Sequence, residues 1–232
     1  MRFGVVQFGG SNCDRDVVYA LSKVCSVDTD LIWYKERLKK NYDAVILPGG
    51  FSYGDYLRAG AIAARTAIMG DVVKHAESGK LVLGICNGAQ ILAESGLVPG
   101  VFTINAYPKF ICKWVHLRLE NVISPFTSLY KKGDVVKMPI AHAEGRYVAP
   151  AETLSALNKN NRVVFRFCDE NGNVTSDVNP NGAAENITGV LSVKNNVLAM
   201  MPHPERSSEQ ILGSADGKRI FESMIQYIER KD

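Results

Sequence analysis

The sequence predicts an α/β protein with a doubly wound, mainly parallel sheet and antiparallel additions. In the first half of the chain, short apolar runs alternate with amphipathic segments, which is typical of a parallel sheet with helices on both faces. After Pro108 the segments alternate polar and apolar residues, which is typical of antiparallel strands. The chain has 232 residues, of which 46% are hydrophobic and 22% charged, so one core and a single domain over residues 1–232 are expected.

The elements of the first half follow in order from these patterns. Apolar runs predict strands at residues 2–8, 27–33, 44–47 and 81–85. Helical spacing covers residues 14–24, 62–78 and 87–94, and Gly96 is placed to end the last of these helices. These strands and helices alternate as a parallel sheet requires.

The second half predicts further strands at residues 114–121, 135–140, 162–169, 187–193 and 196–201. The last two flank a hairpin-like turn at Lys194-Asn195. Residues 172–185 are rich in Asn, Gly and Pro and are expected to form a mobile surface excursion rather than a linker, because strands of one sheet pattern lie on either side. A final helix is expected over residues 215–229.

Composition excludes several classes of protein. The formal net charge is +3 and the basic residues are spread along the chain, so we expect no nucleic-acid partner. No apolar run approaches the roughly 20 residues of a membrane helix, so we expect no membrane partner and a cytoplasmic protein. The five cysteines are scattered without a C-x-x-C pair, so neither a disulfide framework nor a metal site is expected, and four of them are interpreted as packing residues.

The segment 81–90, LVLGICNGAQ, carries the most specific signal in the chain. Glycines stand two residues before and two residues after Cys86, which lets the backbone make the sharp strand-to-helix turn of a nucleophile elbow. The N-terminus of the following helix favours a thiolate at this position. Cys86 is therefore the candidate nucleophile, and the alternative interpretation is a packed core cysteine.

A second segment, 202–206, reads PHPER and follows an apolar run. Prolines hold the chain extended and place His203 and Glu205 on one side of it. His203 could take the proton of Cys86, while Glu205 would hold the imidazole in the required tautomer, giving a Cys-His-Glu triad.

Two backbone N–H groups would stabilise the oxyanion that forms when a thiolate attacks a carbonyl. The first N–H group belongs to Asn87, the residue after the candidate nucleophile. The second would come from the Gly49-Gly50 loop, which directly follows a predicted strand. In open α/β sheets the ligand crevice lies beyond the carboxyl ends of the strands, so both loops are expected to meet at one site.

These residues resemble the class I, or triad-type, glutamine amidotransferases, whose elbow is similar to residues 84–90 and whose triad closes with His-Pro-Glu. Further segments at 10–14, 48–60, 140–147 and 201–206 narrow the resemblance to the family of glutaminase subunits of phosphoribosylformylglycinamidine synthase. The similarity spans nearly the whole chain and implies a flavodoxin-like fold.

The resemblance implies a subunit that hydrolyses L-glutamine to glutamate and ammonia through a cysteine thioester. The ammonia would pass to a large synthetase subunit, which uses ATP and Mg to convert formylglycinamide ribonucleotide in purine biosynthesis, while a small subunit assists assembly. Carried over by position, the catalytic residues are Cys86, His203 and Glu205. Gly50 and Asn87 match the oxyanion hole, and Gln90 matches an elbow glutamine that lies at the substrate amino acid. No cofactor is implied for this chain itself.

The chain departs from the family pattern at two places. It has Gly9-Gly10 where the family has Pro-Gly, and Ala143 where the family has Gly. Neither departure touches the triad.

The glycine-rich segment after the first predicted strand suggests a phosphate-binding loop, but the G-x-G-x-x-G spacing and a P-loop lysine are both missing.

Several residues keep two interpretations. His142 and Glu144 form a second His-x-Glu, and with Arg146 they are either a hydrogen-bonded strand end or a contact to the synthetase. Cys13 is interpreted as a packing residue rather than a reactive one. His75 and His116 are interpreted as structural. Tyr53, Asp55 and Arg58 line either the site or the partner surface.

Three alternative functions remain at this point. The chain could be a glutaminase subunit of another amidotransferase, a peptidase-like or deglycase-like cysteine hydrolase of similar fold, or a non-catalytic subunit. No ATP-grasp region or P-loop accompanies the triad, so a glutaminase of this sequence is expected to have low activity alone and to be activated by its partner, through movement of the Gly49–Phe51 loop.

Overall fold

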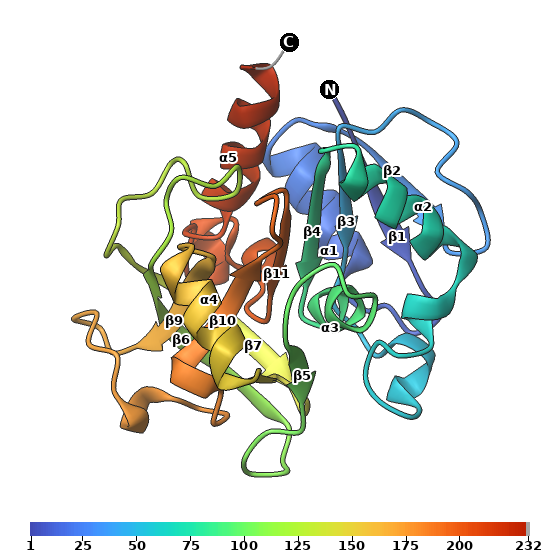
Figure 1. Cartoon of the computed structure of the whole chain (residues 1–232). Helices are drawn as coiled ribbons and strands as arrows, with labels where there is room; N and C mark the ends of the chain where they lie inside the picture. Colours follow the sequence, from blue (N-terminus) through green and yellow to red (C-terminus); the bar gives the residue numbers. More distant parts are fainter. Residues whose placement is uncertain (231–232) are drawn as a thin grey trace.

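The computed structural model describes residues 1–230. Within them the chain forms one nine-stranded mixed sheet, in the order β2-β1-β3-β4-β11-β10-β9-β6-β7, and a two-stranded sheet of β5 and β8 (Figure 1). The first five strands of this order are parallel to one another and the remaining ones are antiparallel. The predicted fold class is confirmed.

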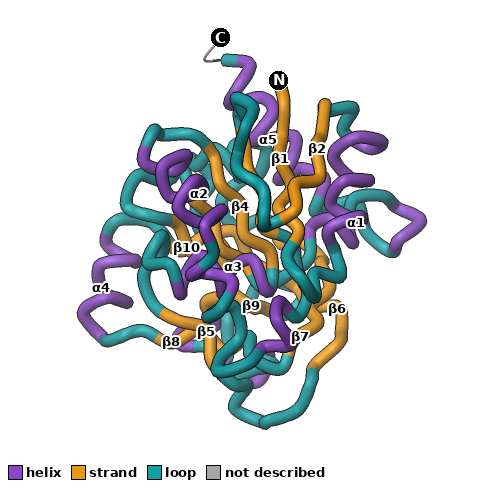
Figure 2. Tube along the Cα trace, turned by 90° about the vertical axis from the view of Figure 1, so that its right-hand side faces the viewer, coloured by secondary structure: helices purple, strands orange, loops and turns teal. Residues whose placement is uncertain are grey.

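The parallel half contains β1 (Arg2–Gln7), β2 (Asp28–Trp33), β3 (Ala44–Leu47), β4 (Leu81–Ile85) and β11 (Val197–Met200). Every residue of β3, β4 and β11 is buried, because helices cover both faces of the sheet here. Figure 2 shows α2 and α3 on one side of these strands and α1 on the other. The strands at 44–47 and 81–85 agree with the sequence prediction to the residue.

The predicted helices are found with two local differences. Helix α1 (Asp14–Tyr19) runs directly into a π-helical segment, η1 (Ala20–Val24), so the predicted helix at 14–24 widens in its second part. The segment predicted as one helix at 62–78 splits into η3 (Ala63–Arg65) and α2 (Ala67–Glu77). The split falls at Thr66, whose backbone is extended with φ −74° and ψ 156°.

Helix α3 (Asn87–Glu94) follows β4 with Cys86 alone between them. Ser95 caps its C-terminus, and Gly96 follows with a positive φ of 74°, as the sequence predicts.

The antiparallel half contains β6 (Ile111–Leu119), β7 (Val135–His142), β9 (Val163–Cys168) and β10 (Ile187–Leu191). The segment between β9 and β10 includes η4 (Ser176–Val178) and η5 (Ala184–Asn186) and joins neighbouring strands, as expected of an excursion within one sheet. It is fastened to the body: Asn181 is fully buried and donates a hydrogen bond to the carbonyl oxygen of Gly145 at 2.8 Å.

Three elements were not anticipated: β5 (Val101–Thr103), β8 (Arg146–Val148) and α4 (Ala151–Lys159). The two strands have three residues each, too few for a periodic pattern, and α4 buries only Leu157 fully. The last helix, α5 (Lys218–Glu229), begins three residues later than predicted.

Strand β7 lies at the end of the large sheet, so one side of its backbone has no partner strand. That side faces the segment after β11, because the carbonyl oxygen of Pro139 accepts the backbone N–H of His203 at 2.9 Å. The antiparallel half therefore folds back over the carboxyl ends of β4 and β11. In residues 1–230 no helix is both long and apolar enough to cross a membrane.

Candidate active site

Cys86 occupies the turn between β4 and α3 in a strained conformation. Its φ of 50° and ψ of −106° place it outside the regions that L-residues prefer. Its backbone is held on both sides: its N–H donates to the carbonyl of Met200 on β11 at 2.8 Å, and its carbonyl accepts the N–H of Gln90 at 3.1 Å. The neighbouring strand and the helix thus impose the elbow that the sequence predicts.

The elbow glycines are required by close packing. A β-carbon on Gly88 would lie 1.9 Å from the carbonyl oxygen of Leu47 at the end of β3. One on Gly84 would lie 2.6 Å from the carbonyl oxygen of Gly88. Both distances are far below a van der Waals contact, so only glycine allows α3 to start this close to β3 and β4.

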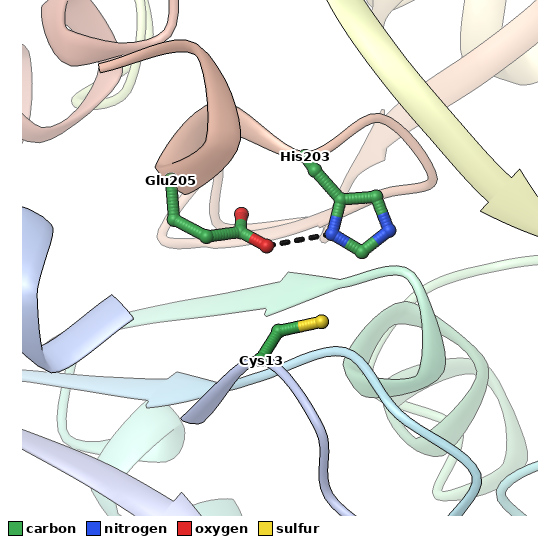
Figure 3. A group of neighbouring side chains, drawn as sticks. All are labelled: Cys13, His203 and Glu205. Atoms are coloured by element: carbon green, nitrogen blue, oxygen red, sulfur yellow. Dashed lines mark hydrogen bonds and ion pairs between the residues drawn. The ribbon is translucent and has the colours of Figure 1, made fainter. Parts of the chain in front are cut away.

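His203 and Glu205 form a buried pair directly after β11. The Nδ1 atom of His203 donates to Oε1 of Glu205 at 2.6 Å, and both side chains are about 98% buried or more (Figure 3). The short turn η6 (Pro204–Ser207), with proline in its first position, brings the two side chains to the same side. In the neutral imidazole with its proton on Nδ1, the lone pair is on Nε2, which has no hydrogen-bond partner among residues 1–230.

The charge on His203 is set by its neighbours. Burial alone lowers the pKa of His203, but the carboxylate of Glu205 and the sulfurs of Cys86 and Cys13 raise it, and the pKa ends well above its ordinary value. A raised pKa makes the imidazole of His203 a stronger base for a neighbouring thiol proton.

The sulfur of Cys86 has a different partner in the resting site. Within residues 1–230 it makes no hydrogen bond to His203; it donates to the carbonyl oxygen of Ala141 on β7 at 3.5 Å. Catalytic hydrogen bonds are often long or misaligned without substrate. Cys86 and His203 are nonetheless close enough that Cys86 raises the pKa of His203.

The loop after β3 reaches the elbow. Gly50 has a φ of 152°, and the backbone N–H of Ser52 donates to the side-chain oxygen of Asn87 at 3.1 Å. The N–H of Gly50 makes no hydrogen bond within residues 1–230, and the first N–H groups of α3, including that of Asn87, have no partner within the helix. The structure therefore brings the two predicted oxyanion-hole positions to one loop-and-elbow junction.

Gln90 is held by the protein itself. Its Nε2 donates to the carbonyl oxygen of Glu144 at 2.7 Å, and its Oε1 accepts from Nδ2 of Asn87 at 2.9 Å. It is 95% buried. Its predicted contact with the substrate amino acid stays a prediction, and its visible role is to join α3 to the chain that follows β7.

Two carboxylates lie around this junction. Asp55, in the turn η2 (Ser52–Asp55), lies 3.5 Å from Nδ2 of Asn87, and Oε2 of Glu144 accepts the N–H of Ala59 at 3.2 Å. Burial, and secondly repulsion from Glu144, raises the pKa of Asp55 to about 6. The sequence left two interpretations for Asp55, the site or the partner surface. Its contact with Asn87 places it at the candidate site.

The second His-x-Glu does not form a catalytic pair. His142 bonds through Nδ1 to the side-chain oxygen of Asn105 at 3.1 Å rather than to Glu144. Burial, and then the charge of His203, lowers the pKa of His142 to about 4, so its imidazole is neutral at physiological pH. His142 is therefore the hydrogen-bonded strand end that the sequence left as one of two interpretations.

Sequence reasoning missed the carbonyl of Ala141 and the surroundings of His203. Cys13 is 98% buried, as expected of a packing residue, but it lies against the triad, and Nη2 of Arg206 donates to its sulfur at 3.1 Å. The sequence motif at residues 202–206 includes Arg206, but no local sequence pattern indicates its contact with Cys13, 193 residues earlier in the chain. The donor atoms of Cys13, His203 and Glu205 lie within 4.8 Å of one another, a spacing that could hold a metal ion, but Arg206 already supplies a cation at this place.

Comparison with known proteins gives a consistent family. A family profile described as a CobB/CobQ-like glutamine amidotransferase domain matches residues 1–228. A protein of Methanosarcina barkeri named phosphoribosylformylglycinamidine synthase subunit PurQ is 56% identical over 228 residues, covering 98% of each chain. The protein of the same name from Methanocaldococcus jannaschii is 53% identical over 230 residues, covering 99% of this chain and 100% of the relative.

Among solved structures, a chain in the structure of PurLQS from Thermotoga maritima superposes with a TM-score of 0.87 and 45% identity, covering 98% of each chain. The elbow, the buried His203–Glu205 pair and full-length similarity at this level point the same way. The chain belongs to the CobB/CobQ-like glutamine amidotransferase family and, within it, to the PurQ subunits of phosphoribosylformylglycinamidine synthase.

Proposed function

We propose that this chain is the glutaminase subunit of a phosphoribosylformylglycinamidine synthase, in which Cys86, His203 and Glu205 hydrolyse L-glutamine. The observation that carries the proposal is the buried His203–Glu205 pair, 2.6 Å between Nδ1 and Oε1, with a free Nε2 beside the strained Cys86 elbow. These are the parts that a thiol needs to attack a carboxamide.

The reaction begins when Nε2 of His203 takes the thiol proton of Cys86. The thiolate attacks the side-chain carbonyl carbon of glutamine, and the oxyanion accepts hydrogen bonds from the N–H groups of Asn87 and Gly50. His203 then gives its proton to the departing nitrogen, the C–N bond breaks, and ammonia leaves a thioester on Cys86.

Water completes the cycle. His203 removes a proton from a water molecule, whose oxygen attacks the thioester carbon, and the C–S bond breaks to release glutamate and the thiolate. Throughout, Glu205 keeps the proton on Nδ1 and stabilises the imidazolium. Neither step requires a metal or cofactor in this chain.

The partners belong to the same proposal. Ammonia would pass to a separate large synthetase subunit, which uses ATP and Mg to convert formylglycinamide ribonucleotide to formylglycinamidine ribonucleotide, while a small subunit assists assembly; all would act in the cytoplasm. Low activity alone is expected, with activation when the partner moves the Gly49–Phe51 loop. Support comes from the open N–H of Gly50 and the tie of Ser52 to Asn87, which couple this loop to the nucleophile.

The first experiment measures glutamate release from glutamine by this chain with its synthetase partners, ATP and formylglycinamide ribonucleotide, for wild type and Cys86→Ala. Release that depends on the partners and disappears in Cys86→Ala supports the proposal. Equal rates with and without the synthetase would contradict coupling, and an active Cys86→Ala would contradict the triad. Activity on peptides or glyoxals but not on glutamine would favour a different hydrolase of this fold.

A further inference from the structure

Cys13 lies beside the His203–Glu205 pair, and the proposed mechanism gives it no task. It comes from the loop between β1 and α1, on the opposite side of β3 from Cys86. In Figure 3 its sulfur points toward the edge of the His203 ring that bonds to Glu205. The sulfur, a nitrogen of His203 and a carboxylate oxygen of Glu205 lie within 4.8 Å of one another.

Gly49 is the point around which these side chains gather. A β-carbon on Gly49 would lie 3.0 Å from the sulfur of Cys13, 2.8 Å from Cε1 of His203 and 3.4 Å from Cβ of Cys86. Gly49 therefore lies next to Cys13, Cys86 and the His203 ring, and its lack of a side chain leaves room for all three. Cys13 comes from the loop after β1 and Cys86 from the turn after β4, the two strands that flank β3.

Arg206 connects Cys13 to the acid of the triad. Its Nη2 donates to the sulfur of Cys13 at 3.1 Å, and its Nε lies 3.3 Å from Oδ2 of Asp16. The same Nε is 4.0 Å from Oε1 of Glu205, the oxygen that accepts from His203. One guanidinium is therefore shared among three acceptors, and its contact with Glu205 is the longest.

We propose that Cys13 is a positioning residue for glutamine hydrolysis: its sulfur holds Arg206 off Glu205, so that the carboxylate directs its charge to His203. This inference rests on the proposed function. If Arg206 moved closer to Glu205, their 4.0 Å ion pair would shorten to a hydrogen bond and compete with Nδ1 of His203 for Oε1. The imidazole would then be a weaker base and less firmly aimed at Cys86.

The charged and titratable groups facing His203 come from four parts of the fold. Glu205 and Arg206 lie on its own segment, Cys13 lies on the β1–α1 loop with Asp16 behind it on α1, Cys86 lies on the elbow, and His142 lies at the end of β7. His142 and Arg206 oppose a positive charge on His203, and the carboxylates and sulfurs favour it. A change at Cys13 acts on His203 directly, through the loss of its sulfur, and indirectly through Arg206 and Glu205, and both effects lower the pKa of His203.

Two substitutions are expected to act in opposite directions. Cys13→Ala frees Arg206 to close on Glu205, so the basic limb of the pH profile, where His203 loses its proton, moves down by about half a pH unit or more. Arg206→Gln removes the competing cation and moves the same limb up. In Cys13→Ala, kcat for glutamine falls about tenfold with little change in KM, because the substrate contacts remain.

The readout is the pH dependence of Cys86 alkylation by iodoacetamide, followed by peptide mass spectrometry, with the pH profile of kcat/KM for glutamine in the assembled complex. All variants carry Cys112→Ser, because Cys112 is an exposed thiol and its interpretation as a packing residue was wrong. Cys168→Ser is the matched control, a buried cysteine on β9 in the antiparallel half. Cys13→Ser keeps a hydrogen-bond acceptor for Arg206 and is expected to restore most of the wild-type profile.

The positioning role is supported by three results together. The basic limb of the pH profile moves in opposite directions in Cys13→Ala and Arg206→Gln, Cys13→Ser restores it, and Cys168→Ser leaves it unchanged. Parallel shifts, or wild-type pH profiles in Cys13→Ala with a merely lower melting temperature, overturn it and leave Cys13 a packing residue. The proposed function fails separately, if the wild-type complex releases no glutamate or Cys86→Ala still does.

Discussion

The side-chain oxygen of Asn87 accepts a hydrogen bond from the backbone N–H of Ser52 across 3.1 Å. The residue after the nucleophile is thereby tied to the loop after β3, which carries Gly50. The same side chain donates to Gln90 at 2.9 Å, so one amide joins the loop, the elbow and the second turn of α3. Asn87 thus ties the loop to the elbow, while backbone hydrogen bonds of Gly49 and Phe51 hold the same loop to residues 10–13.

Asn87→Ala is expected to lower kcat about 10–100-fold with a small effect on KM, because the loop loses its tie and a donor to the oxyanion is displaced. The measurement is steady-state glutaminase kinetics in the assembled complex. Asn87→Asp keeps the acceptor for Ser52 and should fall between wild type and Asn87→Ala. A normal kcat in the alanine variant would show that the loop holds its place without Asn87.

Glu205→Gln keeps the shape of the acid but removes its charge. The amide can present either its oxygen or its NH₂ group to Nδ1 of His203, so the tautomer is no longer fixed, and kcat/KM is expected to fall about 10²–10⁴-fold. Kinetics over a range of pH, with circular dichroism to verify folding, test this. A loss of less than threefold in a folded variant would remove Glu205 from the triad.

Gly88→Ala should destabilise the protein by about 3 kcal/mol or more, because its β-carbon would lie 1.9 Å from the carbonyl oxygen of Leu47 and the backbone must shift. Gly70→Ala is the matched control, since a β-carbon there meets nothing within 4 Å on the exposed face of α2. That substitution should stabilise by about 0.5–1 kcal/mol. Urea unfolding of both variants compares them directly, and similar midpoints would contradict the close-packing account of the elbow.

Asp55 makes a prediction about pH and stability. Its pKa rises from 3.8 to about 6 on folding, so between these values the folded state binds more protons than the unfolded state. Stability from this group is therefore present below about pH 4 and is lost as pH rises to 6 and above.

Asp55→Asn is accordingly expected to raise the melting temperature relative to wild type at pH 8 and to have little effect at pH 4. Thermal unfolding at both pH values tests this, with Asp177→Asn, an exposed acid between β9 and β10, as the control. A difference between wild type and Asp55→Asn that does not depend on pH would refute the shifted pKa.

The elements that sequence patterns predicted best are the fully buried ones. Strands β3 and β4 match to the residue because their apolar runs of 4 and 5 residues are too short for a buried helix and are followed by glycine-containing turns. Helix α4 was missed because it packs on the core through only two leucines, Leu157 fully buried and Leu154 partly buried, which form a narrow apolar stripe. Thr66 breaks the predicted helix at 62–78 through its backbone, which a side-chain pattern does not encode.

The candidate site also contains residues that local sequence patterns identify and residues that they do not. Cys86, His203 and Glu205 could be found because local glycines and prolines mark the turns that present them. Ala141 could not, because it contributes a main-chain carbonyl, which every residue has. Cys13 was interpreted as packing, and it is buried, but its contact with Arg206 depends on how β1 and β11 are ordered in the sheet.

More than one hundred residues separate the proposed nucleophile Cys86 from the proposed base His203, while parallel pairing of β4 with β11 brings together the strand ends that they follow. A fragment of the chain that ends before β11 has the nucleophile and the glycine loop but no base and no carboxylate. The edge of β7 must also close over the site, since it binds both the His203 backbone and the Cys86 sulfur. On the proposed mechanism, glutamine hydrolysis is therefore expected only once the chain has folded through β11, its last strand.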